Sequence, residues 1–268
     1  MESYAVLLKS ESNVPAPTLA AELAKILNRP TGELTRALRE RPWILIESVD
    51  AGDLDAVFEA LGREGVVAKA IPELHMPHLP RSLRVREADP MKKGLFLKVA
   101  EPPCPPLVPW EEVRLIAVGE VTLAPHEEAQ IYGAWRGGEA STAPSRGADA
   151  TIGSAALASS RQKSKSPLLM AITTSGEQPL TLGIDAGNFS YDYLKKRMKP
   201  TSKENLKQFL RDIQKRHPTV DITPRARSWL EGEATINYRF RSLKAFAVYL
   251  RWVHQQIDER DAEEAEVE

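Results

Sequence analysis

Residues 43–71 read WILIESVDAGDLDAVFEALGREGVVAKAI. The stretch starts with a short apolar run of the kind found in buried strands. Asp53 follows as a candidate N-cap, and the apolar residues after it recur at helical spacing until Gly62 and Gly65, where the helix is expected to end. The run at 66–71 predicts another strand. These residues therefore predict a strand–helix–strand unit.

The residues before this stretch add one strand and two helices. Residues 4–8 form a short apolar run that predicts a strand. Thr18 is a candidate N-cap for a first helix, and Thr31 is the expected start of a second one. The order βαβαβ over residues 1–75 predicts a small α+β domain in which helices cover one face of a sheet.

This arrangement resembles small ferredoxin-like modules. The part from Ala20 to Ile71 also resembles the C-terminal domain of the bacterial ribosomal stalk protein, where a helix, a proline-led strand, a helix ending in glycine and a β-branched strand follow one another. This sequence lacks the lysine-rich factor-binding helix of that domain. The resemblance therefore implies a compact interaction or regulatory module and carries over no ribosomal function.

A second domain is predicted from residue 81 onward. Residues 81–85 and 95–99 are strand candidates joined by a turn-rich tip, and a long strand is expected from Trp110 to Leu123. The segment PWEEVRLI, residues 109–116, resembles a strand of bacterial pleckstrin-homology-like domains. That resemblance implies a bent antiparallel sheet in which the tryptophan anchors the strand edge.

The remainder of this region predicts an insertion, a hairpin and several helices. Residues 136–166 are rich in Gly, Ala, Ser and Thr, and they predict a disordered insertion because they cannot bury enough apolar surface to offset the cost of ordering. A hairpin turn is expected at 175–178. Thr201 and Glu204 have the spacing of a capping box and predict a helix that ends before Pro218.

A last helix, at about 242–258, carries one apolar stripe that either packs on its own domain or forms an intermolecular coiled coil. Residues 258–268 hold seven acids against one arginine and predict a disordered acidic tail. The whole chain is thus predicted to be α+β. It comprises a βαβαβ module at 1–75, a linker at 76–80, and a mostly antiparallel β domain with C-terminal helices at 81–257.

Composition excludes several classes of protein. Formal net charge is −1 over 268 residues, so the chain as a whole is not a polyelectrolyte. The single cysteine, Cys104, excludes an intrachain disulfide framework and favours a cytoplasmic protein. Apolar runs are too short for a transmembrane segment. No motif predicts catalytic residues, a metal site or a cofactor, and the proline between His75 and His78 argues against a helical metal pair.

Charge is unevenly distributed along the chain. Residues 195–254 hold fifteen Lys or Arg against five Asp or Glu, and the basic positions are interleaved with aromatic residues, namely Trp229, Tyr238, Phe240, Tyr249 and Trp252. One interpretation is a basic face that binds nucleic acid or another anionic surface, and the other is an ordinary solvated helix surface. The residues predicted to form the basic face are Lys195, Lys196, Arg197, Lys203, Lys207 and Arg211.

The function expected from these patterns is that of a two-domain adaptor or scaffold that is not an enzyme. Its partners are expected to be other proteins. The alternative is binding of nucleic acid or an anionic surface through the basic region 195–254. A third hypothesis is an enzyme whose site is assembled from residues scattered along the chain, with His217 or His254 beside carboxylates.

Overall fold

A computed structural model describes residues 2–12, 14–99, 105–123 and 166–267. The helices and strands of these residues form an α+β protein, as the sequence predicts. Cys104 lies outside the described residues, and so does the predicted insertion 136–166 apart from its last residue.

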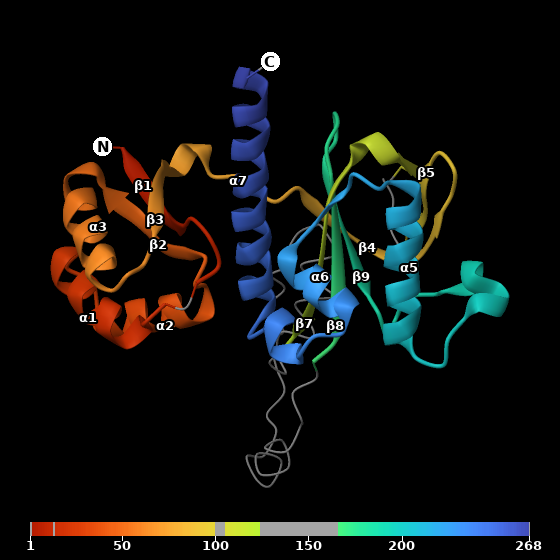
Figure 1. Cartoon of the computed structure of the whole chain (residues 1–268), viewed down its shortest axis with the longest axis horizontal. Coiled ribbons are helices and arrows are strands. Elements are labelled where there is room, and N and C mark those ends of the chain that lie inside the picture. Colours follow the sequence, from red (N-terminus) through yellow and green to blue (C-terminus); the bar gives the residue numbers. More distant parts are fainter. Residues whose placement is uncertain (1, 13, 100–104, 124–165, 268) are drawn as a thin grey trace, which may run out of the picture. The chain divides into compact units, whose positions relative to one another are not determined.

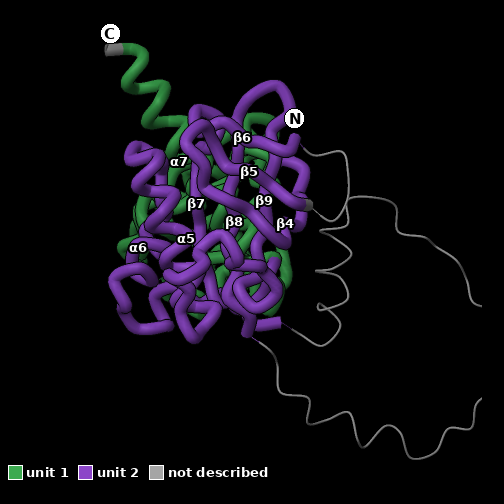
Figure 2. The backbone as a smooth tube through the Cα atoms, turned by 90° about the vertical axis from the view of Figure 1, so that its right-hand side faces the viewer, with its two compact units in different colours: residues 1–79, 244–268 green, residues 80–243 purple. Residues whose placement is uncertain are grey.

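The chain divides into two compact units. Unit 1 consists of residues 1–79 together with 244–268, and unit 2 consists of residues 80–243 (Figure 2). Unit 2 is therefore inserted, in chain order, between two segments of unit 1. The first division point lies at the end of the linker predicted at 76–80.

Unit 1 contains a three-stranded antiparallel sheet in the order β2-β1-β3. Two helices connect β1 to β2 and a third connects β2 to β3, so the element order follows the predicted βαβαβ pattern with the first helical segment split at Pro30 (Figure 1). The elements are β1 (Ser3–Leu8), α1 (Ala16–Ile26), α2 (Thr31–Glu40), β2 (Ile44–Asp50), the 3₁₀ turn η1 (Ala51–Asp53), α3 (Leu54–Arg63), β3 (Ala68–Pro72) and the 3₁₀ turn η2 (Glu73–His75).

Helices α1, α2 and α3 cover one face of this sheet. Each presents an apolar stripe that packs into one core with apolar residues of the strands, as the helical spacing predicts. The largest fully buried side chains of this core include Leu8, Leu19, Leu23, Leu38, Leu45 and Leu61.

The other face of the unit 1 sheet packs against the last helix, α7 (Leu243–Val267). The indole Nε1 of Trp252 donates a 2.7 Å hydrogen bond to the carbonyl oxygen of Leu8 in β1. The rings of Tyr249 and Trp43 lie 4.9 Å apart. The sheet of unit 1 is thus enclosed between helices that are more than 170 residues apart in the sequence (Figure 1).

Two predictions about the C-terminal region differ from the structure. The sequence predicts that the last helix belongs to the second domain, but its partners Leu8, Trp43 and Glu47 place it in unit 1. The sequence also predicts a disordered acidic segment at 258–268, but α7 continues to Val267. Two causes are evident: the segment is rich in Glu and Ala, which are good helix formers, and Glu259 forms an ion pair with Lys69 of β3.

Unit 2 is built on a sheet in the order β10-β7-β8-β9-β4-β5-β6, with β11 also pairing with β7. The consecutive pairs β4–β5, β5–β6, β7–β8 and β8–β9 are antiparallel, whereas β4 pairs in parallel with β9 and both β10 and β11 pair in parallel with β7. The strands are β4 (Arg81–Pro90), β5 (Gly94–Val99), β6 (Leu107–Pro109), β7 (Val113–Val121), β8 (Leu168–Thr174), β9 (Leu180–Asp185), β10 (Asp221–Ile222) and β11 (Arg239–Phe240).

The long strand predicted from Trp110 to Leu123 is shorter in the structure. Trp110 belongs to the 3₁₀ turn η3 (Trp110–Glu112), and the strand β7 begins at Val113. The indole Nε1 of Trp110 donates a hydrogen bond to the carbonyl oxygen of Met91, 3.1 Å away, in the turn between β4 and β5. The tryptophan is therefore buried beside this hairpin, and the chain turns there before it enters the sheet.

Two helices, α5 (Ser202–Arg216) and α6 (Pro224–Glu231), pack with this sheet in one apolar core. Two 3₁₀ segments, η5 (Asp192–Arg197) and η6 (Thr235–Tyr238), precede α5 and follow α6. The core includes Leu206, Phe209, Leu210, Ile213 and Trp229 from the helices. None of the helices in the described ranges is both long and apolar enough to span a membrane.

Candidate functional site

Helix α5 is the element that positions the candidate site, and its sequence explains why it forms. Thr201 is the N-cap: its Oγ1 accepts a 3.2 Å hydrogen bond from the backbone N–H of Glu204 and donates to the Glu204 carboxylate at 2.7 Å. The predicted N-cap is therefore confirmed, but the Glu204 carboxylate accepts from the Thr201 hydroxyl and not from the backbone N–H that a full capping box uses. The buried stripe of α5 fixes its orientation on the sheet, so its opposite, polar face is held in a defined position.

Three of the six predicted basic residues gather on this polar face. Lys203, Lys207 and Arg211 follow one another at i, i+4 and i+8, which places them along one side of the helix. They line a hollow of about 400 Å³, which we call the α5 hollow. Its lining residues are Lys199, Thr201, Lys203, Glu204, Lys207, Gln208 and Arg211.

Lys203 is held in place by Tyr238 of η6. Its Nζ donates a 3.0 Å hydrogen bond to the phenol oxygen and lies 5.3 Å from the ring centroid. Burial alone would raise the pKa of Tyr238, but the hydrogen bonds with Lys203 and Thr235 outweigh burial and lower it. The phenol oxygen is thus an acceptor matched to the charged ammonium group.

Lys207 occupies a partly buried position against α6. Its Nζ donates to the carbonyl oxygen of Leu230 at 3.3 Å and lies 5.4 Å from the centroid of the Trp229 ring. Burial, followed by repulsion from Lys203 and Arg211, lowers the pKa of Lys207. Lys207 is therefore close enough to Lys203 and Arg211 to be repelled by both.

Lys199 completes the cationic lining of the α5 hollow and was not among the predicted site residues. Asn205 holds its backbone in place: Asn205 Oδ1 accepts from the Lys199 N–H at 2.6 Å, and Asn205 Nδ2 donates to the Lys199 carbonyl oxygen at 3.0 Å. The spacing of four residues to Lys203 was the available signal, but Pro200 interrupts the helical pattern. Within the described ranges, Lys199, Lys203, Lys207 and Arg211 form no ion pair with a carboxylate.

The other three predicted basic residues lie outside the α5 hollow. Lys195 and Lys196 are exposed in η5, and Lys195 has a φ of 49°. Arg197 forms an ion pair with Asp212, with 3.0 Å between the interacting atoms. The predicted basic face is therefore split, and only its α5 part forms a shared hollow.

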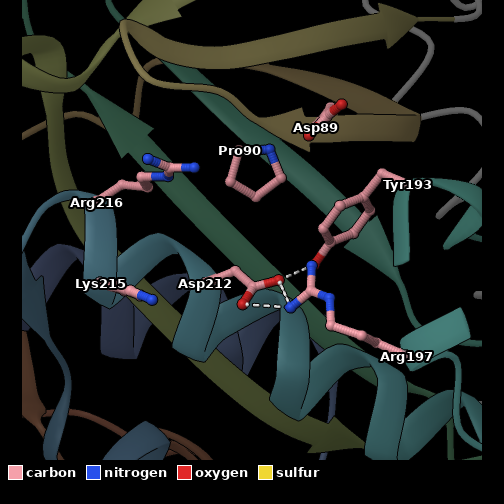
Figure 3. A pocket seen from close by; sticks show the side chains of 7 residues that line it. All are labelled: Asp89, Pro90, Tyr193, Arg197, Asp212, Lys215 and Arg216. Atoms are coloured by element: carbon pink, nitrogen blue, oxygen red, sulfur yellow. Dashed lines mark hydrogen bonds and ion pairs between the residues drawn. The ribbon is translucent and has the colours of Figure 1, made fainter. Parts of the chain in front are cut away.

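Arg197 contributes instead to a second hollow, of about 360 Å³, on another side of α5 (Figure 3). Asp212 is its central group and accepts hydrogen bonds from Tyr193, Arg197 and Gln208, with lengths of 3.0, 3.0 and 2.9 Å. Burial alone would raise the pKa of Asp212, but these three donors outweigh it and lower the pKa. Burial, and then the Asp212 charge, raises the pKa of Tyr193. This arrangement keeps the carboxylate ionised and joins η5 to α5.

The basic region 195–254 is divided between the two units, with residues 195–243 in unit 2 and 244–254 in unit 1. Arg239 pairs with Glu120 of unit 2, and Arg251 pairs with Glu47 of unit 1. The interleaved aromatic residues are core residues of their units rather than stacking platforms. Trp229, Tyr238, Phe240, Tyr249 and Trp252 are all at most 5 % exposed.

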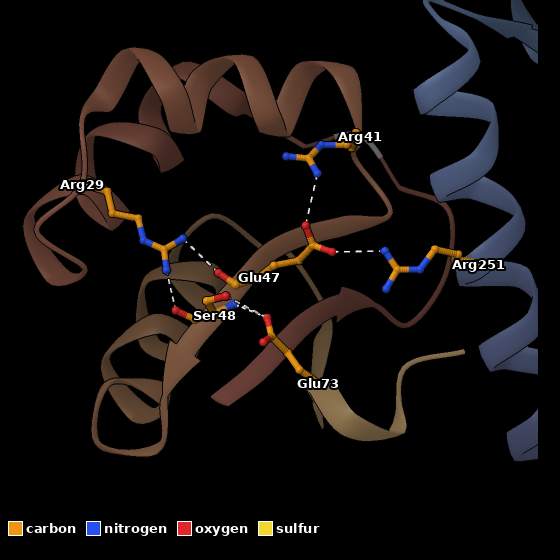
Figure 4. Close-up of polar contacts among 6 residues, drawn as sticks. All are labelled: Arg29, Arg41, Glu47, Ser48, Glu73 and Arg251. Carbon is orange, nitrogen blue, oxygen red and sulfur yellow. Dashed lines mark hydrogen bonds and ion pairs between the residues drawn. The ribbon is translucent and has the colours of Figure 1, made fainter. Parts of the chain in front are cut away.

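Unit 1 contains a separate polar network around a β-bulge (Figure 4). The register pairs Tyr4 with Val49 and Val6 with Ile46, so β2 has one more residue than β1 in this interval. The extra residue forces Ser48 to a φ of 58°, which is unfavourable for a non-glycine residue.

Glu73 and Arg29 hold the strained Ser48. One Glu73 carboxylate oxygen accepts from the Ser48 N–H at 2.5 Å and from its Oγ at 3.0 Å, and the other accepts from Ser3 Oγ at 2.8 Å. Arg29 donates to the carbonyl oxygens of Glu47 and Ser48. These hydrogen bonds all support the β-bulge, so we assign the network a structural role.

The network predicts an acid-sensitive contribution to the stability of unit 1. Burial would raise the pKa of Glu73, but hydrogen bonds from Ser3 and Ser48, and the charge of Arg29, lower it. A carboxyl group with a depressed folded-state pKa stabilises the fold above its unfolded-state pKa, and this contribution is lost as the pH falls through the folded-state value. We expect Glu73→Gln to lower the free energy of unfolding at pH 7 by about 0.5 kcal/mol, a value reduced because solvent screens this accessible carboxylate, and to cost less at pH 3.

Urea unfolding followed by circular dichroism at both pH values would measure this effect. Glu59→Gln, at an exposed position of α3, is the matched control and should change stability little at either pH. An equal loss of stability for Glu73→Gln at pH 7 and pH 3 would contradict the role assigned to the ionised carboxylate.

No protein-family model, curated protein or solved structure matches this chain. The described residues also contain no group of three or more His, Cys, Asp or Glu side chains that could hold a metal ion. The fold and the site thus define an α+β chain of two units, the second of which has a cationic hollow on α5.

Proposed function

We propose that this protein is an adaptor that binds an anionic segment of a partner protein in the α5 hollow. The observation that supports the proposal is the clustering of four cations around one concave site without a carboxylate partner in the described part of the chain. Mutual repulsion makes such a cluster unfavourable by itself, and an anionic ligand would relieve it.

The arrangement favours a protein ligand over nucleic acid. Proteins that bind single strands combine basic residues with exposed aromatic rings on which bases stack. In this protein the aromatic rings of the basic region are buried, and several of its arginines are already paired with carboxylates. Four cations around a compact hollow fit a short acidic or phosphorylated segment better than an extended phosphate backbone.

The proposal also includes the fold family of each unit and the cellular location of the protein. The ferredoxin-like and pleckstrin-homology-like assignments of the two units remain part of it, because both kinds of module serve as interaction domains. An adaptor role without catalysis and a location in the cytoplasm, favoured by the single cysteine, also belong to the proposal.

Fluorescence anisotropy with labelled anionic peptides tests the binding function. We expect an acidic or phosphorylated peptide to bind, with an affinity that falls as the salt concentration rises from about 50 to 300 mM. The combined variant Lys203→Gln, Lys207→Gln and Arg211→Gln should weaken binding by at least about 30-fold, because it removes three charge-assisted contacts.

A matched control variant distinguishes binding in the α5 hollow from nonspecific attraction by the net charge of the protein. The variant Lys92→Gln, Lys93→Gln and Lys196→Gln removes the same net charge from exposed positions of unit 2 outside the hollow. It should change the affinity by less than about threefold. Equal losses in the two variants, or no binding at about 50 mM salt, would overturn the proposal. Tighter binding of single- or double-stranded nucleic acid than of any peptide would assign the hollow to nucleic acid instead.

A further inference from the structure

Two of the four cationic side chains of the α5 hollow are held in place within unit 2 itself. Lys203 and Lys207 each use one ammonium hydrogen for an acceptor within unit 2, namely the Tyr238 phenol and the Leu230 carbonyl group. An ammonium group has three donors, so each lysine keeps hydrogens for a ligand while its nitrogen stays in place. Arg211 adds a guanidinium group with no hydrogen-bond partner among the described residues. The hollow therefore offers two positioned ammonium groups beside a guanidinium group that has all its donors left for a ligand.

The charge balance of the lining is strongly positive. Glu204 is the one carboxylate against four cations, and its side chain is engaged by the N-cap residue Thr201. The N-terminus of the 15-residue helix α5 also lies at the hollow, since Thr201 is both its N-cap and a lining residue, and the helix dipole adds a partial positive charge there. A single carboxylate would neutralise only part of this charge.

We infer that the α5 hollow recognises a phosphoryl group, carried by a phosphorylated serine or threonine of the partner protein. A phosphoryl group brings a charge of about −1.5 to −2 and three strong acceptor oxygens, which matches four cationic donor groups better than a carboxylate does. A hollow of about 400 Å³ has room for the group and for the adjoining side chain. This inference rests on the proposed function, because it specifies the anion that the same site takes.

The ionisable groups that line the hollow determine how binding of a phosphorylated peptide should depend on pH. They are Lys199, Lys203, Lys207 and Arg211, with Glu204 on α5 and Tyr238 across from Lys203. The described lining contains no histidine. Between pH 5.5 and 7.5 the group expected to change its charge most is therefore the phosphate, whose second pKa is about 6.

The test compares two peptides that differ at one position, one with phosphoserine and one with glutamate. Calorimetric titration of the full-length protein at about 50 mM salt should give at least about tenfold tighter binding of the phosphopeptide. From pH 5.5 to 7.5 its affinity should rise by about fourfold as the phosphate becomes a dianion. The affinity of the glutamate peptide should stay nearly constant, and any titration of the protein would affect both peptides alike.

The possible outcomes separate this inference from the proposed function. Equal affinities for the two peptides, or parallel pH profiles, would overturn the phosphoryl assignment and leave anionic peptide binding intact. Failure of both peptides would overturn both. Inorganic phosphate serves as a competitor: competition as strong as that of the phosphopeptide would overturn the assignment to a partner protein and indicate a small phosphate ligand. The Lys92→Gln, Lys93→Gln and Lys196→Gln variant should retain the preference for phosphoserine.

Discussion

Replacing Trp252 with alanine is expected to destabilise unit 1 by about 3–5 kcal/mol, the usual cost of truncating a large buried aromatic side chain. Trp252 is 5 % exposed, and its indole donates to Leu8 in the central strand of the sheet. Truncation would leave a cavity beside β1 and remove that hydrogen bond. Since native domains are stable by only about 5–15 kcal/mol, the loss is a large part of the total.

Hydrogen exchange resolved by segment would check this prediction in the intact chain. The amides of β1 and β2 should lose protection in Trp252→Ala, while those of β7 and β8 in the core of unit 2 keep most of theirs. Trp252→Phe retains an aromatic ring and should cost less than Trp252→Ala. Glu263→Ala, at an exposed position of the same helix, should stay within about 0.5 kcal/mol of wild type. Unchanged protection of β1 in Trp252→Ala would contradict the assignment of α7 to unit 1.

The position of α7 also shows what the sequence could and could not predict about the fold. Its apolar stripe is evident in the sequence and correctly predicts a helix that buries one face. The stripe does not say which surface covers that face, because any apolar surface of suitable shape would do so. The contacts with Leu8 and Trp43 join residues more than 200 positions apart, and no local pattern encodes such a pairing.

The candidate site was predictable to a similar extent. The i, i+4, i+8 spacing correctly predicts that Lys203, Lys207 and Arg211 share one side of a capped helix. The spacing could not show that Tyr238 and Leu230 fix two of these lysines, since both contacts come from the chain beyond α5. The aromatic residues misled the prediction, because interleaving with basic residues in the sequence does not indicate whether a ring is exposed.

Lys207→Met is expected to separate binding from stability. Burial and the neighbouring cations lower the pKa of Lys207, so the folded state favours the charged form less than the unfolded state does. At neutral pH such a lysine is charged in both the folded and the unfolded state, and it lowers the free energy of unfolding. This loss becomes smaller as the pH rises through the lowered folded-state pKa, because the folded protein then releases the proton. Methionine retains much of the apolar stem that lies near Trp229 and removes the repulsion.

We therefore expect Lys207→Met to leave the stability of unit 2 unchanged or to raise it by up to about 1 kcal/mol, while weakening binding of an anionic peptide by about 10- to 100-fold. Urea unfolding and anisotropy on the same protein samples would measure both quantities. Lys92→Met, at an exposed position in the β4–β5 turn, should change neither by much.

The two measurements together decide why a partly buried lysine occupies this position. If Lys207 served the fold through its hydrogen bond to Leu230 and its contact with Trp229, the substitution would lower stability and affect binding only indirectly. If it serves the ligand, stability and binding should change in opposite directions or stability should not change at all. A loss of more than about 1 kcal/mol of stability with unchanged affinity would argue for the structural role and against the α5 hollow as a binding site.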